Sequence, residues 1–110
     1  MYARRVSMHL KPNGVAGFQE KIEDQVIPLL RKQTGFLDAV TFLYPNRKEV
    51  HAISLWQSEE DADAYGRTVY PEVMKILSPV VDVLEGITRV QTYEVLNSTF
   101  DGVNASAMSA

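Results

Sequence analysis

Residues 54–62 read Ser54-Leu55-Trp56-Gln57-Ser58-Glu59-Glu60-Asp61-Ala62, and the chain changes there from a strand pattern to a helix pattern. The residues before this change, Val50 to Gln57, form a short β-rich run. Ser58 offers a hydroxyl to the free N–H groups of a first helical turn, and the carboxylates after it suit the positive end of the helix dipole. We therefore predict a strand that ends near Gln57 and a helix that runs from Ser58 through Arg67.

The flanking segments supply further strands and helices. Apolar and polar residues alternate from Tyr2 to Leu10, which is the period of a strand. From Val15 the apolar residues recur every three or four positions as far as the glycine stop at Gly35, so a helix is predicted there, kinked or interrupted at Pro28. The remaining predicted elements are a hairpin partner strand over 36–44, a second helical segment from Tyr70-Pro71 to Leu84, and a last strand over 88–96.

The predicted order is strand, helix, strand, strand, helix, strand. This is the ferredoxin-like βαββαβ plan of the α+β class, with an antiparallel four-stranded sheet and the helices on one face. We predict that residues 1–97 form this single domain. Residues 98–110 are rich in Ser, Ala and Asn and are predicted to be a flexible C-terminal tail.

Composition narrows the possible functions. The chain has 110 residues, no cysteine and a formal net charge of -3. The lack of cysteine excludes a disulfide framework, a thiolate nucleophile and a zinc ribbon. A mildly acidic chain has no long-range attraction to phosphate backbones or anionic lipid, and no apolar run approaches the ~20 residues that cross a bilayer. We expect no nucleic acid or membrane partner and a cytoplasmic location.

The second face of the predicted sheet needs a partner. Two helices cover one face only, yet the strands carry apolar residues on both faces. We expect this uncovered face to pair with the same face of a second copy in a two-fold homodimer. The residues predicted to lie on it are Leu37, Leu43, Ile53, Leu55, Tyr93 and Val95.

The chain resembles a known family, the dimeric α/β-barrel proteins of the antibiotic biosynthesis monooxygenase type. Four stretches carry the likeness: the first strand into Leu10-Lys11-Pro12, Gln33-Thr34-Gly35-Phe36, residues 54–62, and Val90-Gln91-Thr92-Tyr93-Glu94-Val95. The resemblance implies a dimeric α/β barrel. It also implies one of several functions, because the family includes cofactor-free oxygenases of polyphenolic compounds, haem-degrading enzymes and members without an assigned activity.

Two departures from the family pattern bear on function. The haem-degrading branch has an asparagine on the first strand, where this chain has Val6, and a haem-ligating histidine in the helical region, whereas no histidine follows His51. The resemblance therefore does not imply haem degradation. The oxygenase branch has an asparagine shortly before the tryptophan, where this chain has Ala52, so that motif is incomplete as well.

A ligand pocket is predicted on the helix-covered face. Trp56 lies there by alternation with the small residues Ser54 and Ala52, which leave room for a flat aromatic ligand to stack on the indole. The alternative is an ordinary core in which the indole N–H bonds to a backbone carbonyl. Further candidates for the pocket wall are Val6, Met8, Val40, Phe42, Val69 and Tyr70.

Arginine and histidine residues provide the remaining candidate chemistry. Arg4 and Arg5 must point to opposite faces, and one of them either binds an acidic or phenolate substrate or forms a salt bridge. His9 and His51 share a parity and are candidates for a proton relay or half of a metal site with Glu49, or else are structural or exposed. Because no complete ligand set is visible, we predict no metal site.

Two functions remain open. No phosphate loop, nucleophile elbow or dinucleotide fingerprint is present, so we predict no resident cofactor, and redox chemistry rests on the substrate's own electrons or a borrowed cofactor. The first hypothesis, implied by the resemblance, is a cofactor-independent monooxygenase of a small phenolic compound, with Trp56 against the substrate and Tyr70 or Arg4 at its oxygen. The alternative is a non-catalytic small-molecule-binding or structural homodimer.

Overall fold

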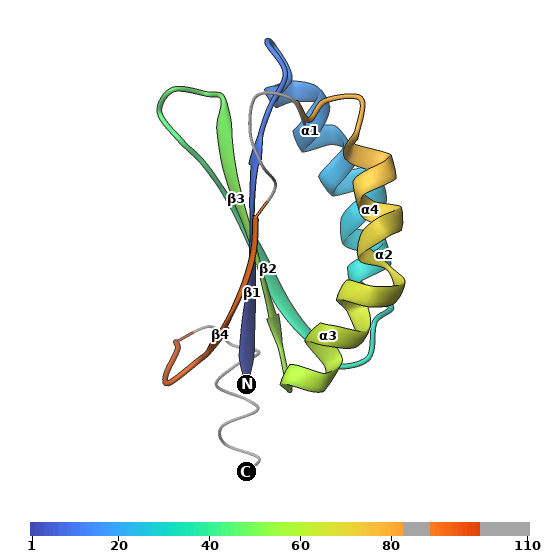
Figure 1. The fold of residues 1–110 in the computed structure, drawn as a ribbon, viewed down its shortest axis with the longest axis vertical. Coiled ribbons are helices and arrows are strands. Elements are labelled where there is room, and N and C mark those ends of the chain that lie inside the picture. The colour runs from blue at the N-terminus through green and yellow to red at the C-terminus, as the bar shows by residue number, and fades with distance from the viewer. Residues whose placement is uncertain (83–88, 100–110) are drawn as a thin grey trace.

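The computed structural model describes residues 1–82 and 89–99, and within them it has the predicted α+β fold. One antiparallel sheet has the strand order β2-β3-β1-β4, and the helices lie together on one of its faces (Figure 1). In chain order the elements are β1 (Tyr2–His9), α1 (Val15–Lys21), η1 (Ile22–Val26), α2 (Ile27–Arg31), β2 (Phe36–Leu43), β3 (Glu49–Trp56), α3 (Glu59–Thr68), α4 (Tyr70–Leu77) and β4 (Arg89–Glu94).

The core lies between the sheet and the helices. Alternation along β1 buries Arg4, Val6 and Met8 against the helices and leaves the residues between them at intermediate exposure. In the antiparallel register, Val6 pairs with Ala52 and Met8 pairs with Val50, so the inward faces of the two central strands are continuous. The largest side chains that are less than 2 % exposed anchor this layer: Val50, Trp56, Leu77 and Val81.

The predicted change from strand to helix occurs at Ser58. The Ser58 hydroxyl accepts a hydrogen bond from the Asp61 N–H at 3.1 Å, and three carboxylates occupy the first turn of α3. The strand β3 ends at Trp56, next to Gly35, whose carbonyl accepts the Gln57 N–H at 2.8 Å. Gly35 has φ +80°, a conformation that a residue without a side chain adopts without strain. The α2–β2 and β3–α3 junctions are thereby held side by side.

The long helix predicted from Val15 adopts a π-helical turn before Pro28. Proline has no N–H, so the hydrogen bond that an α-helix would make to the Asp24 carbonyl is missing. Instead the Ile27 N–H bonds to the Ile22 carbonyl, five residues back, and residues Ile22–Val26 form the π-helix η1 between α1 and α2. The helix therefore continues through Pro28 with one widened turn.

A β-bulge changes the predicted faces of β2. Phe36 pairs with Trp56 and Asp38 pairs with Leu55, so Leu37 is the extra residue. Leu43 then pairs with Val50 and lies on the helix-covered side, whereas we had predicted the uncovered face. Phe42 pairs with His51 and lies on the uncovered face, whereas we had predicted the pocket wall. The extra residue shifts the alternation by one, which exchanges the two faces of the strand.

The second predicted helical segment, the last predicted strand and the predicted tail all extend beyond the described residues. The second helical segment is confirmed from Tyr70 to Leu77 and ends there. Residues 78–80 form a turn and Val81 makes an isolated β-bridge with Leu10, so the predicted continuation of the helix through Val81 is wrong, while Leu84 lies outside the described residues. Of the predicted last strand, β4 covers Arg89–Glu94, and residue 88 is not described. Residues 100–110 of the predicted tail also fall outside. In the described part of the chain, no helix is long and apolar enough to cross a membrane.

Candidate functional site

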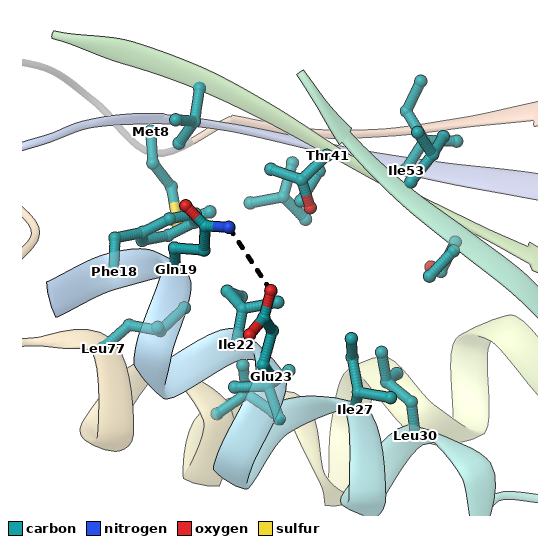
Figure 2. A pocket seen from close by; sticks show the side chains of 18 of the residues that line it. Met8, Phe18, Gln19, Ile22, Glu23, Ile27, Leu30, Thr41, Ile53 and Leu77 are labelled. Atoms are coloured by element: carbon teal, nitrogen blue, oxygen red, sulfur yellow. Dashed lines mark hydrogen bonds between the residues drawn. The ribbon is translucent and has the colours of Figure 1, made fainter. Parts of the chain in front are cut away.

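A cavity of about 410 Å³ lies between the covered face of the sheet and the helical layer (Figure 2). This volume is within the range of small-molecule sites. Aliphatic side chains from β1, β3, α1, η1 and α4 form most of its wall, together with the aromatic ring of Phe18. The polar residues in the wall are Arg4, Gln19, Glu23, Thr41, Ser54, Tyr65 and Tyr70. The cavity is therefore an apolar chamber with a few localised polar groups.

Arg4 is the buried cation of this chamber. It is only 6 % exposed, because β1 turns its side chain toward the helices. Its guanidinium carbon lies 4.2 Å from the ring centre of Tyr70 and 5.2 Å from that of Tyr65. Burial lowers the pKa of the Arg4 guanidinium, and the two tyrosines together with Asp63 oppose that shift. An arginine still stays protonated at neutral pH, so the chamber contains a positive charge.

Among residues 1–82 and 89–99 no carboxylate forms an ion pair with this cation, although Asp63 acts on it from a longer distance. Both close pairs between a basic side chain and a carboxylate in that part of the chain involve histidines. The sequence left open whether an arginine would form a salt bridge, and for Arg4 the described contacts are aromatic instead. Arg5 points to the opposite face, where it donates a hydrogen bond to Gln91 and lies 5.8 Å from the ring centre of Tyr93.

Tyr70 contributes a hydrogen-bond donor with no described acceptor. Its hydroxyl oxygen is buried and has no hydrogen-bond partner in the described structure. Burial raises the pKa of Tyr70, and burial also raises the pKa of Tyr65 to about 12, although Arg4 opposes both shifts. Both phenols are therefore protonated at neutral pH. An unpaired buried O–H beside an unpaired buried cation is the arrangement expected of a site that receives an anionic oxygen.

The raised pKa of Tyr65 predicts sensitivity to alkali. The folded protein keeps this phenol protonated up to about pH 12, whereas the unfolded chain releases the proton near pH 10. The contribution to stability is complete below pH 10 and is lost as the pH rises toward 12. Urea unfolding at pH 9 and pH 11.5 should show a loss of about 2 kcal/mol that Tyr65→Phe largely removes. Tyr93→Phe, on the other face, should leave the loss unchanged.

Trp56 lies behind the cavity wall. It is 0 % exposed and is not among the residues that line the cavity. Its Nε1–H donates a hydrogen bond to Ser54 Oγ at 2.8 Å, and its ring centre lies 4.9 Å from that of Tyr65. Tyr65 therefore occupies the place in the cavity wall that we predict for the Trp56 indole. Trp56 packs against Tyr65 on the side away from the cavity.

The other predicted pocket residues divide into two groups. Arg4, Val6, Met8, Ser54 and Tyr70 line the cavity, as does Ala52. Val40 borders the cavity, although the bulge places it on the same face of β2 as Phe42, opposite Ile53. Phe42 is 53 % exposed on the other face of the sheet. Val69 packs against the core without lining the cavity.

Sequence reasoning missed Gln19 and Glu23. Both side chains are exposed to solvent, and both also line the cavity. The Gln19 amide donates a hydrogen bond to Glu23 Oε1 at 3.3 Å, and both side chains point toward the sheet in Figure 2. The available signal was their spacing, since Gln19 and Glu23 follow Val15 by four and eight residues and so share its side of the helix.

His9 and His51 lie close together, on the uncovered face and away from the cavity. Their Nε2 atoms are each 3.2 Å from a different oxygen of Glu49. The Tyr44 ring lies 4.7 Å from the His51 ring. Within the described residues, no group of three or more acidic or histidine side chains is suited to hold a metal ion.

Comparison with known proteins establishes the fold. No family model matches the chain, and no curated protein matches it. Many solved structures do. A monooxygenase from the gene ActVA-Orf6 of Streptomyces coelicolor, in complex with nanaomycin D, has a TM-score of 0.70 and 18% identity, covering 90% of each chain. SnoaB, a cofactor-independent oxygenase from Streptomyces nogalater, has a TM-score of 0.68 and 10% identity, covering 89% of this chain and 95% of that one.

A protein of unknown function from Nitrosomonas europaea, NE2512, is equally similar, with a TM-score of 0.70 and 14% identity over 90% of this chain and 92% of that one. The predicted resemblance is confirmed for the fold, which is that of the antibiotic biosynthesis monooxygenase-like structures. At these identities the likeness extends no further than the fold.

Proposed function

We propose that this protein is a cofactor-independent monooxygenase that acts on a small aromatic compound with an acidic oxygen. The observation that carries the proposal is the buried Arg4 cation, with no described carboxylate partner, beside the buried and unpartnered Tyr70 hydroxyl in an apolar chamber. These two groups suit a phenolate or enolate oxygen, and the aliphatic walls suit a flat ring system.

The proposed chemistry uses the substrate's own electrons. Arg4 and Tyr70 stabilise the substrate as an oxyanion, which makes an electron-rich carbon available to dioxygen. For a ring CH₂ group, the carbon loses two hydrogens and gains one oxygen as a carbonyl, and the second oxygen atom leaves as water. The four electrons that reduce dioxygen come from that carbon. The apolar walls exclude bulk water from the anion during the reaction.

Oxygen uptake with anthrone as the substrate tests this proposal. The wild-type protein should consume oxygen faster than a protein-free blank, with one molecule of oxygen used for each anthraquinone formed. Tyr70→Phe should lower the rate about tenfold, because one hydrogen bond to the oxyanion is lost. Tyr44→Phe, which removes a phenol from the uncovered face, is the matched control and should retain the full rate. Anthrone binding without oxygen uptake would instead favour a non-catalytic small-molecule-binding protein.

We also propose that two copies associate through the uncovered face of the sheet. Phe42, Tyr44 and Tyr93 are 53 %, 40 % and 44 % exposed there, and Arg5 Nε is buried without a described partner on the same side. The same sheet face of a second copy would cover these rings, because a two-fold axis places each patch against the identical patch of the other copy.

Sedimentation tests this association. The wild-type protein should sediment as a dimer at micromolar concentration. Phe42→Glu should shift it to a monomer, since the variant places two carboxylates in an apolar contact. Ala16→Glu adds the same charge to an exposed position on α1 and should remain dimeric. A wild-type protein that sediments as a monomer would rule out the proposed association.

A further inference from the structure

The cavity has polar groups at two separate places. One is the Arg4–Tyr70 pair beside α3, where Arg4 approaches Gly66. The other is the Gln19–Glu23 pair on the helical wall, which Figure 2 shows on the side of Met8 and Phe18. Arg4 and Met8 share a face of β1 four residues apart, so their Cα atoms are separated by about 13 Å. The wall between the two places is largely aliphatic.

Glu23 lies at the solvent edge of the helix face that lines the cavity. The lining positions of this helical segment are 15, 18, 19, 22, 23, 26, 27 and 30, which follow the three- and four-residue spacing of one helix face. Glu23 is exposed at the edge of that face, and in Figure 2 its side chain projects from η1 toward the sheet, opposite Thr41.

The Gln19–Glu23 pair presents hydrogen-bond acceptors. Gln19 donates to one carboxylate oxygen of Glu23, which leaves the second carboxylate oxygen and the Gln19 carbonyl oxygen as acceptors. Among residues 1–82 and 89–99, no basic side chain forms an ion pair with Glu23. Both side chains are exposed while lining the cavity, so they stand at its opening. This end of the cavity favours a ligand donor, whereas the Arg4 end favours an anionic oxygen.

We propose that Glu23, oriented by Gln19, accepts a hydrogen bond from a hydroxyl at the end of the ligand farthest from Arg4. The ligand that fits both places carries an acidic oxygen at one end and a hydroxyl at the other. Glu23 is a specificity-determining residue in this scheme. The inference rests on the proposed function, because it requires the cavity to bind an aromatic anion at Arg4.

Two matched probes test the inference by calorimetric titration at pH 7: 2-naphthoate and 6-hydroxy-2-naphthoate. Both carry a carboxylate for Arg4, and only the second carries a hydroxyl at the far end. The wild-type protein should bind the hydroxylated probe about tenfold more tightly. Glu23→Ala should bring the two dissociation constants within about twofold of each other. The ratio of the two constants cancels any general effect of the lost negative charge on anion binding.

Glu20→Ala is the matched control, because Glu20 is exposed on the same helix and does not line the cavity. It should keep the tenfold preference. Equal affinities of the wild-type protein for both probes, or a preference that survives Glu23→Ala, would overturn the role of Glu23 and leave the Arg4 site standing. If neither probe binds to the wild-type protein, the ligand site itself is refuted and the role of Glu23 with it.

Discussion

Replacement of Arg4 by methionine is expected to weaken 2-naphthoate binding about 100-fold, which corresponds to about 2.7 kcal/mol. Arg4 is the cation that lines the apolar cavity, and no described carboxylate forms an ion pair with it. Methionine fills a similar volume but leaves the ligand's carboxylate without a partner in an apolar chamber, where an unpaired charge is costly. Calorimetric titration of the two proteins measures the difference.

The same substitution should not destabilise the fold. Exchanging a buried charge for an apolar side chain of similar volume is often neutral or stabilising, so the free energy of unfolding should stay within about 1 kcal/mol or rise. A loss of affinity without a loss of stability would therefore distinguish a binding role of Arg4 from a structural one. Arg5→Met removes the same charge one residue away, on the opposite face of β1, and should leave the affinity unchanged. An equal loss of affinity in both variants would contradict a specific role of Arg4.

Trp56→Ala is expected to lower the free energy of unfolding by about 4 kcal/mol, a large part of the stability of a domain this size. Trp56 is 0 % exposed and lies between Phe36, at 5.6 Å edge to face, and Tyr65, at 4.9 Å. Removing it leaves a cavity and a Ser54 hydroxyl without its donor. Urea unfolding followed by circular dichroism measures the loss, since Trp56 is the only tryptophan.

Trp56→Phe provides the comparison for this prediction. It retains an aromatic ring against Tyr65 and removes the indole N–H, so the cost should be less than half that of Trp56→Ala. Because Trp56 does not line the cavity, Trp56→Phe should also bind 2-naphthoate nearly as well as the wild-type protein. A loss of binding without a loss of stability would show that the indole contacts the ligand directly.

Local sequence patterns were sufficient to predict the fold and part of the candidate site. The alternation along β1 correctly placed Arg4, Val6 and Met8 on one face, and the hydroxyl of Ser58 correctly marked the start of α3. Such signals depend only on residues near in sequence. The order of elements then left the ferredoxin-like plan as the natural arrangement.

One error arose where an extra residue shifts the period of a strand. The bulge residue Leu37 exchanged the predicted faces of Phe42 and Leu43. This shift changes neither composition nor hydrophobicity, so the pattern alone does not reveal it. The depth of Trp56 was also not predictable, because it depends on how α3 brings Tyr65 over the indole.

The most direct observation is a crystal structure of the protein with 2-naphthoate. The proposed site predicts the naphthalene rings in the cavity and a carboxylate oxygen within hydrogen-bond distance of both the Arg4 guanidinium and the Tyr70 hydroxyl. A naphthoate bound only on the uncovered face, beside Tyr44 and Tyr93, with the cavity unchanged, would contradict it.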